Sequence, residues 1–356
     1  RNTAPYLIAS YYDSSLVDGM AGSVNTPPNK DIRWEKTTTV NVGVDFALFR
    51  HRLSGTIEYY NKYSVDLLAA INGSPTQGFG YTTLMTNNGK MVNRGVEITL
   101  SGEIIRQKDF SWNASLLYAF NRNKVKHISV QPSLWDSRIS MPTSYPMVGK
   151  PLYGIYAYKW AGLNENGDPQ VYDAENNVTS GPARDYHALV YCGTTVPIHN
   201  ASLTNVLRYK GFEFSAMLIL DAGHKLRSSN IPSINMSNGR ITSTAKGIVD
   251  RWTQPGDVTD VPRLLFSNDT ENFNTHRTEL YRYSDLFVYD ASNIRLSNIS
   301  LAYRVPAHWC KKISLSGARL QFNVENVATF AFDSKANYDL GGKVKPNYVW
   351  GLYLNF

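Results

Sequence analysis

Apolar and more polar residues alternate along nine stretches of the chain, with the period of two residues that is typical of β-strands. The clearest stretch begins at Phe110, where six apolar residues occupy alternate positions up to Phe120. The final stretch ends the chain, and its large apolar residues share one parity: Tyr348, Trp350, Leu352, Leu354 and Phe356. The pattern predicts strands over residues 34–48, 53–66, 91–104, 109–122, 200–209, 211–222, 291–305, 313–328 and 346–356.

One stretch changes parity within its length, which predicts a β-bulge. Ile294 and Leu296 lie on one parity, whereas Ile299 and Leu301 lie on the other. One extra residue near Asn298 would return all four apolar side chains to a single face of the sheet.

The connections between the predicted strands alternate in length. Short ones lie near 49–52, 105–109, 210–211 and 306–312, and long ones near 67–90, 123–199, 223–290 and 329–345. Outer-membrane barrels have short periplasmic turns and long extracellular loops, whereas soluble sandwiches need no such alternation. The terminal strand alone would also fit a soluble sandwich, but the alternation favours an all-β, transmembrane antiparallel barrel.

The more polar faces carry charged residues, which suits a water-filled lumen better than a closed core. These residues are Asp45, Glu58, Glu97, Glu213, Arg319 and Glu325. If the short turns are periplasmic, the last strand runs inward, and so does the first of the nine. Bacterial barrels have an even number of strands, so we expect at least one strand before Arg1 and a larger barrel.

The amino-acid composition does not by itself distinguish a membrane barrel from a soluble β-protein. Of 356 residues 42% are hydrophobic, but no run of about 18 apolar residues predicts a transmembrane helix. The net charge of +7 is spread without a Lys/Arg block, which argues against nucleic-acid binding. Two cysteines are too few for a disulfide framework. No signal peptide is visible, and the chain opens at Arg1 rather than Met, so we expect a mature product or a fragment.

Several short motifs resemble, in order and spacing, the C-terminal third of the SusC/RagA-type TonB-dependent transporters of the Bacteroidetes outer membrane. They include Arg33-Trp34-Glu35-Lys36-Thr37, Asn93-Arg94-Gly95-Val96-Glu97, Asn166-Gly167-Asp168-Pro169, Asp260-Val261-Pro262-Arg263 and the stretch from Ile294 to Tyr303. The resemblance implies a 22-stranded barrel, of which these strands would be roughly 14 to 22. It also implies a plug and a TonB-contacting segment, neither of which lies in this sequence.

The resemblance further implies the partners. A SusD-like surface lipoprotein would cap the barrel and capture a glycan or peptide nutrient, and a dimer of transporter–lipoprotein pairs is a further expectation. The implied function is TonB-dependent active import across the bacterial outer membrane, without a cofactor. A passive porin, an outer-membrane enzyme and a soluble β-rich binding protein stay open as alternatives, although no nucleophile–base pair is recognisable.

Aromatic residues in a long connection are the best candidates for contact with substrate or partner, because their faces stack on sugars and dock onto proteins. They are Tyr153, Tyr156, Tyr158 and Trp160, with Trp252 beside a possible short helix near 239–251. The alternative is that these side chains pack against neighbouring loops. Tyr118, Tyr303, Tyr348 and Trp350 are expected in the interfacial aromatic girdles.

Other candidate sites are weaker. His187, Cys192 and His199 share one long connection, but their loose spacing does not favour a metal site. A Cys192–Cys310 disulfide is not expected, since the two residues fall at opposite ends of the barrel. Asn113 matches a glycosylation triplet but lies within a predicted strand.

The end of the chain resembles the signal read by the barrel-assembly machinery. That signal would comprise Trp350, Leu352, Leu354 and Phe356.

Overall fold

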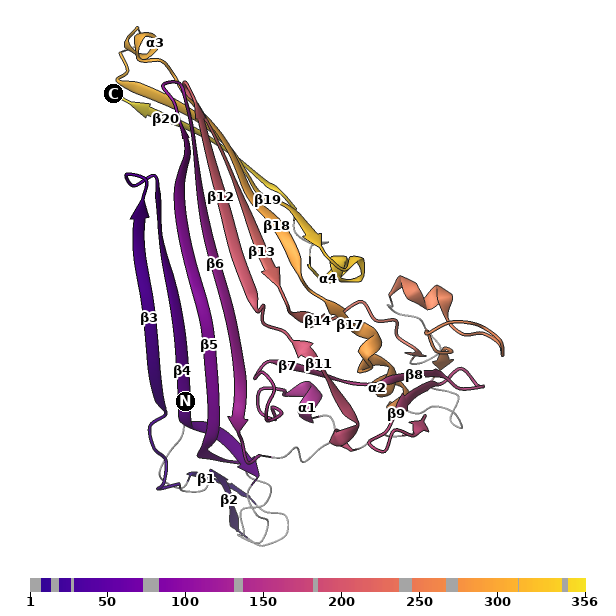
Figure 1. The fold of residues 1–356 in the computed structure, drawn as a ribbon. Coiled ribbons are helices and arrows are strands. Elements are labelled where there is room, and N and C mark those ends of the chain that lie inside the picture. The colour runs from indigo at the N-terminus through magenta and orange to yellow at the C-terminus, as the bar shows by residue number, and fades with distance from the viewer. Residues whose placement is uncertain are drawn as a thin grey trace.

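A curved antiparallel sheet of nine strands dominates the computed structural model (Figure 1). The structure describes residues 8–13, 19–26, 29–72, 83–130, 137–181, 185–236, 245–266, 275–312, 314–340 and 345–356. The strands of the sheet are β3 (Lys36–Leu48), β4 (Leu53–Asn72), β5 (Thr83–Arg106), β6 (Phe110–His127), β12 (His199–Tyr209), β13 (Phe212–Ala222), β18 (Asn293–Arg304), β19 (Gly317–Ala331) and β20 (Asn347–Asn355). They pair in chain order from β3 to β20, as in an up-and-down barrel wall.

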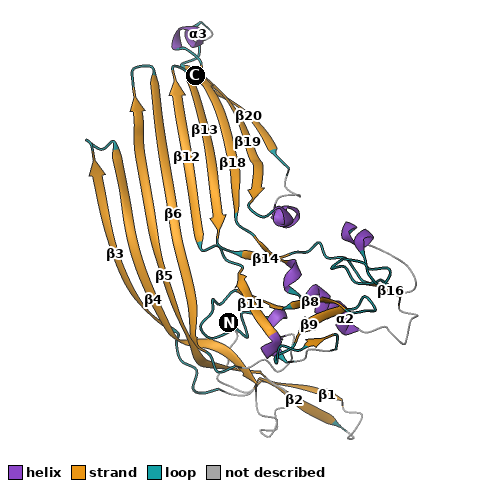
Figure 2. Cartoon of the chain, turned by 45° about the vertical axis from the view of Figure 1, so that its right-hand side comes forward, coloured by secondary structure: helices purple, strands orange, loops and turns teal. Residues whose placement is uncertain are grey.

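All nine strands predicted from the alternating pattern are present in this sheet, and the all-β barrel fold is confirmed as a partial barrel. Figure 2 shows the sheet as a curved wall whose first and last strands, β3 and β20, form its two edges. None of the helices in the described part of the chain has the length and hydrophobicity needed to span a membrane.

The predicted connection at 67–90 is wrong at both its ends, because β4 continues to Asn72 and β5 starts at Thr83. This extension has few alternating apolar residues, so the pattern did not reveal it. Backbone pairing and side-chain amides hold it instead: the Asn87 amide donates to the carbonyl oxygens of Arg33 at 2.8 Å and Asp66 at 2.6 Å.

The predicted bulge is confirmed. The pairing register of β18 shifts between Leu296 and Asn298 against both neighbouring strands. Leu296 is therefore opposite Leu218, and Ile299 is opposite Ala216, so the apolar residues on both sides of the bulge share one face.

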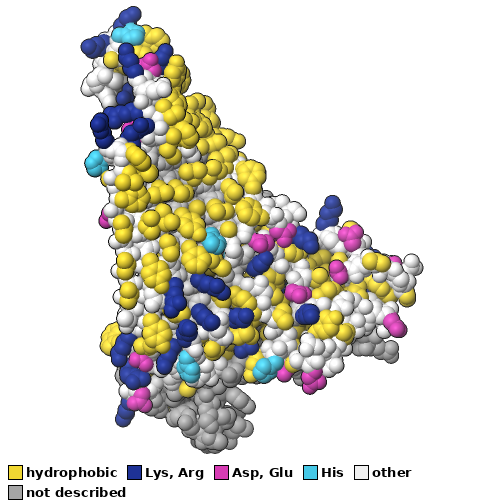
Figure 3. All heavy atoms as spheres, viewed as in Figure 1, with side chains coloured by type: hydrophobic (Ala, Val, Ile, Leu, Met, Phe, Trp, Pro, Cys, Tyr) yellow, Lys and Arg dark blue, Asp and Glu magenta, His cyan; other side chains and the backbone are white. Residues whose placement is uncertain are grey.

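The register joins the apolar positions of all nine strands into one continuous face, here called the outer face. Directly opposite residues of paired antiparallel strands project to the same side of a sheet. One row of such partners runs through Val44, Ile57, Ile98, Tyr118, Ala201, Leu220, Ile294 and Phe330. Figure 3 shows this face as a broad hydrophobic belt. Val44 is 61% exposed and Trp350 78%, an extent of apolar surface that monomeric soluble proteins rarely show.

The short connections all lie at the end of the sheet that carries the C-terminus (Figure 1). The β12–β13 turn has Lys210 at φ 52°, and the β18–β19 connection contains α3 (Ala307–Lys311). The β1–β2 hairpin (Ile8–Asp13 and Met20–Thr26) lies at the opposite end.

The two longest connections do not remain irregular. They pack together at that opposite end into one compact structure, here called the loop unit (described residues 137–198 and 223–292). It contains α1 (Ser137–Ser140), β7 (Gly154–Tyr158), β8 (Trp160–Leu163), β9 (Pro169–Tyr172), β10 (Val178–Thr179), β11 (Leu189–Thr194), β14 (Lys225–Arg227), β15 (Asn235–Met236), β16 (Leu265–Phe266), α2 (Thr275–Arg282) and β17 (Val288–Asp290). A last helix, α4 (Asn337–Leu340), lies between β19 and β20.

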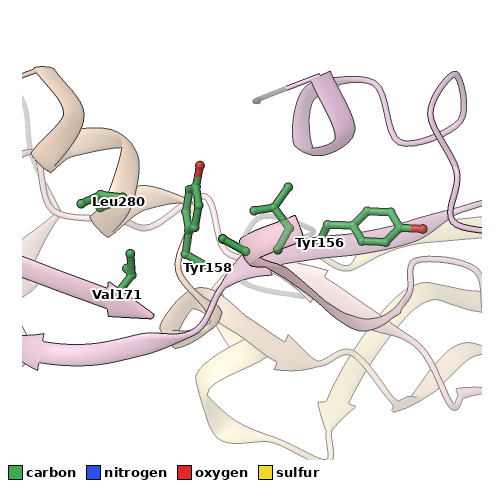
Figure 4. Packing of buried hydrophobic residues seen from close by; sticks show 6 residues of the cluster. Tyr156, Tyr158, Val171 and Leu280 are labelled. Atoms are coloured by element: carbon green, nitrogen blue, oxygen red, sulfur yellow. The ribbon is translucent and has the colours of Figure 1, made fainter. Parts of the chain in front are cut away.

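The loop unit has its own hydrophobic core, which strands of different connections share. Tyr156 and Tyr158 of β7, Val171 of β9 and Leu280 of α2 meet there (Figure 4). A second cluster joins Ile234 to Tyr281 and Phe287. Residues far apart in the chain thus bury their apolar surface against one another.

The two faces of β13 allow a direct test of which side meets lipid. We expect Leu218→Arg, on the outer face near the middle of the strand, to destabilise the folded full-length protein in lipid bilayers by about 2–4 kcal/mol, because the guanidinium would enter hydrocarbon. The matched change Ile219→Arg, on the other face beside Asp221, should cost little. Heat-modifiable gel mobility across a urea series measures both, and equal costs would contradict the assignment.

Candidate functional site

The face of the sheet opposite the hydrophobic belt, here called the inner face, is polar and hydrogen-bonded across strands. Thr56 Oγ1 donates to Asp45 Oδ1 at 2.6 Å, and Asn200 Nδ2 donates to Asp221 Oδ1 at 2.7 Å. Glu213 accepts from two guanidinium groups, those of Arg208 at 2.8 Å and Arg319 at 3.1 Å. These contacts satisfy several charges predicted for the polar face without removing them from solvent.

Carboxylates also gather at one level of the inner face. Glu58 of β4 is directly opposite Glu97 of β5. A shallow depression of about 300 Å³ lies beside them, lined by residues that include Glu97, Asn200 and Asp221. Such a surface offers many hydrogen-bond acceptors to a hydrated solute and attracts positive charge.

A second, larger cavity of about 560 Å³ opens where β4, β5 and β6 meet the loop unit. Its lining mixes apolar and polar side chains, among them Leu68, Met91, Lys90, His127 and Tyr153. Tyr153 is 46% exposed, so its ring is available to a ligand or a partner. Tyr153 was predicted to take part in recognition, and it lines this cavity.

The packing alternative applies to two of the predicted recognition residues. Tyr156 and Tyr158 are each 1% exposed and form the centre of the loop-unit core (Figure 4). Tyr156 Oη accepts from the Met147 amide at 3.0 Å, and burial raises the pKa of its phenol. In this arrangement the two rings offer no free surface on which a ligand could stack, and their burial favours the packing alternative.

The two tryptophans are half-buried and anchored. Trp160 Nε1 donates to Asp260 Oδ1 at 3.0 Å, and its ring lies 6.0 Å from that of Tyr281. Trp252 packs directly against Gly167, where a Cβ atom would come within 2.4 Å of the indole and the φ of +73° also favours glycine. The 3₁₀ helix Lys246–Asp250 precedes Trp252 as predicted, while residues 237–244 lie outside the described part.

A charge cluster that the sequence did not reveal fastens the loop unit together. The Asp168 carboxylate accepts hydrogen bonds from Arg263 Nη2 at 2.8 Å and from Arg277 Nε at 3.0 Å. Arg277 is only 3% exposed, and it also donates to the carbonyl oxygens of Ile234 at 3.2 Å and Arg263 at 2.7 Å. Burial lowers the pKa of Arg277, and the neighbouring Asp168 carboxylate opposes that shift.

Two residues of this cluster belong to motifs that the sequence analysis had already singled out. Asp168 and Arg263 each end or nearly end a motif that carries the family resemblance, Asn166-Gly167-Asp168-Pro169 and Asp260-Val261-Pro262-Arg263. Asp168 and Arg263 are 95 positions apart in the chain. Nothing in this spacing indicates that the two motifs pair.

The loosely spaced metal candidates are not brought together. His187 Nδ1 lies 2.6 Å from Asp185 Oδ1, whereas His199 Nδ1 lies 2.8 Å from Tyr118 Oη on the outer face. Within the described ranges no three His, Cys, Asp or Glu side chains are arranged to hold a metal ion.

Both cysteines are free. Burial, followed by the nearby Asp285 carboxylate, raises the pKa of the Cys192 thiol to about 11, so the thiol is protonated at neutral pH. Cys310 lies in α3, at the other end of the sheet from β11 (Figure 1). Asn113, which matches the glycosylation triplet, lies within β6.

The aromatic residues expected in the girdles occupy outer-face positions. Phe212 and Tyr303 are 4.5 Å apart between ring centroids, and Phe322 lies 4.2 Å from Trp350. On β20 and at the residue that follows it, the side chains of the predicted assembly signal are all exposed: Trp350, Leu352, Leu354 and Phe356.

Comparison with known proteins identifies the family. The family model described as "TonB dependent receptor-like, beta-barrel" matches residues 2–327. The chain belongs to the TonB-dependent receptor β-barrel family. Proteins of this family form outer-membrane β-barrels, which agrees with the sheet and its hydrophobic belt.

Individual relatives within the family agree with the resemblance to SusC/RagA-type transporters. TonB-dependent receptor P3 of Formosa agariphila is 25% identical over 91% of this chain and 33% of its own length. SusC of Bacteroides thetaiotaomicron is 25% identical over 84% of this chain and 29% of its own length. The chain therefore spans about a third of the curated relatives that it matches.

A solved structure shows the same fold. The structure of the RagAB peptide transporter superposes with a TM-score of 0.75, covering 100% of this chain and 39% of that chain at 22% identity. The partial barrel and the loop unit together follow that fold along their whole length.

The Asp168 cluster predicts a selective effect on the loop unit. We expect Asp168→Asn to destabilise the unit by about 3 kcal/mol, because buried Arg277 would keep its charge without a carboxylate. Hydrogen–deuterium exchange of the full-length receptor should then accelerate in β9 and α2 but not in β12 or β13. Glu165→Gln removes the same charge from an exposed position nearby and should leave exchange unchanged; similar protection in both variants would contradict this role.

Proposed function

We propose that this chain is the C-terminal part of the barrel wall of a TonB-dependent importer that carries an oligosaccharide or peptide nutrient across the outer membrane. The observation that carries the proposal is the two-faced sheet: a continuous apolar outer face and an inner face of hydrogen-bonded carboxylates, amides and guanidinium groups. Family membership supports energised transport by the whole receptor.

The inner face supports a polar cargo. Its acceptors include Glu58, Glu97 and Asp221, and its donors include Arg208 and Arg319. Sugars and peptides both offer complementary hydroxyl, amide and charged groups, so both substrate classes fit this wall. One solved relative is described as a peptide transporter, which supports the peptide class in this proposal.

In this proposal the loop unit faces the cell exterior and meets a SusD-like lipoprotein. Exposed apolar side chains on it support a protein partner: Val258 is fully exposed and Val249 is 66% exposed. Tyr153, at the mouth of the larger cavity, is the aromatic residue best placed to touch the cargo. TonB and the plug would act through the remainder of the receptor, and no covalent step is involved.

The test is uptake by cells that express the full-length receptor with its lipoprotein. Labelled oligosaccharide and peptide pools should enter in a TonB-dependent manner, and the purified intact receptor should show no steady conductance in planar bilayers. A permanently open conductance would instead indicate a passive porin, and turnover of either pool by the purified protein would indicate an enzyme. Extraction of the native protein without detergent would contradict the membrane assignment itself.

We further propose that the exposed aromatic and aliphatic side chains of β20, together with the terminal Phe356, act as the assembly signal. Phe356→Asp should lower the amount of folded receptor at the cell surface several-fold, because the terminal ring would no longer offer an apolar contact to the assembly machinery. Asn355→Asp places the same charge one position away, on the opposite parity, and should have little effect. Surface labelling measures the amount of each variant at the cell surface. Normal amounts of the Phe356 variant would contradict the proposed signal.

A further inference from the structure

Four positively charged side chains gather on the outer face where β5 and β6 approach the loop unit. They are Arg94 on β5 with Arg122, Lys124 and Lys126 on β6, here called the basic patch, and all four are exposed. Figure 3 shows Lys and Arg side chains at this level, directly beyond the hydrophobic belt.

Burial along β6 shows which way the patch points. Asn123 and Val125 face the loop unit: Asn123 Oδ1 accepts from the Leu152 amide at 2.8 Å, and Val125 is 4% exposed. Arg122, Lys124 and Lys126 occupy the alternate positions, so they project to the other side. The preceding outer-face position on β6 is Phe120, the last apolar residue of the belt on that strand.

The patch places like charges directly opposite one another. Arg94 and Arg122 are directly opposite one another in the register of β5 and β6, and like charges in that position are destabilising. Arg94 Nε donates to the neutral amide oxygen of Asn61 at 3.0 Å. Across the described residues, no carboxylate forms an ion pair with any of the four.

A nearby pair of basic residues shows the contrast. Arg33 and Lys36 lie at the same end of the sheet, and both are within ion-pair distance of Asp66, at 3.5 Å and 3.7 Å. Two basic side chains at this rim therefore share one carboxylate, whereas the described residues supply no counter-ion to the basic patch.

We propose that the basic patch binds the phosphate groups of lipids in the outer leaflet. Guanidinium groups match phosphate oxygens in a bidentate manner, and lysines add attraction to a negatively charged surface. The acyl chains of the same lipids would lie along Val96 and Phe120, the apolar neighbours of Arg94 and Arg122 on their strands. The inference rests on the outward orientation of the loop unit given under the proposed function.

Lipid selectivity of the purified full-length receptor tests the proposal. Native mass spectrometry in neutral detergent compares binding of diphosphoryl lipid A with that of its dephosphorylated form. The wild type should prefer the phosphorylated lipid, and Arg122→Gln/Lys124→Gln/Lys126→Gln should reduce that preference about tenfold, an effect that weakens as salt is raised. The variant Arg94→Lys/Arg122→Lys, which keeps the charge, should retain most of the preference.

The matched control removes the same charge from the loop unit, away from the belt, as Lys159→Gln/Lys246→Gln/Arg282→Gln; all three positions are exposed. It should keep the wild-type preference, and an equal loss there would overturn the proposal, as would a wild type without preference. Competition by inorganic phosphate at concentrations similar to the lipid would indicate a free-anion site instead. Selectivity in detergent needs no transport, so failure here and failure of import are separate results.

Discussion

The pairing register of the nine-stranded sheet is the constraint on which the rest of this structure depends. Side chains alternate across a strand, so a slip of one residue would move every apolar group to the wrong face. Here backbone hydrogen bonds align Val44, Ile57, Ile98 and Tyr118 across four strands, and the row continues through β12, β13 and β18. The bulge at β18 keeps that alignment where the sequence changes parity. One continuous hydrophobic belt and one continuous polar wall follow from it.

The loop unit depends on a different kind of interaction. Its strands are short, and its stability comes from an apolar core around Tyr156 and Tyr158 together with the Asp168 cluster. A buried guanidinium such as that of Arg277 needs a fixed carboxylate, and this requirement holds distant segments in one arrangement. In the proposed importer, the loop unit presents a surface that includes Tyr153 and Val258 to a cargo or a partner.

The charges on the two faces of the wall serve different surroundings. On the inner face, Glu213 and Asp221 have guanidinium or amide partners within the protein, as expected for groups beside an aqueous passage. On the outer face the hydrophobic belt is free of charge until the basic patch, where Arg94 and Arg122 face one another. The change from apolar to basic side chains along β5 and β6 marks a boundary that matches the edge of a bilayer.

The sequence by itself determined the strands, their two faces, the bulge near Asn298 and the family resemblance, because a period of two is a local property that survives in the linear chain. Tertiary structure decided the fate of the long connections. Tyr156 and Tyr158 were candidates for recognition because they lie in an aromatic-rich stretch. The sequence does not show which of these rings other segments of the same chain will bury. Asp168, Arg263 and Arg277 were visible only as separate residues, since their pairing joins segments about a hundred positions apart by folding alone. The extension of β4 and β5 was hidden for the same reason, because backbone pairing and the Asn87 amide, rather than an alternating pattern, hold it.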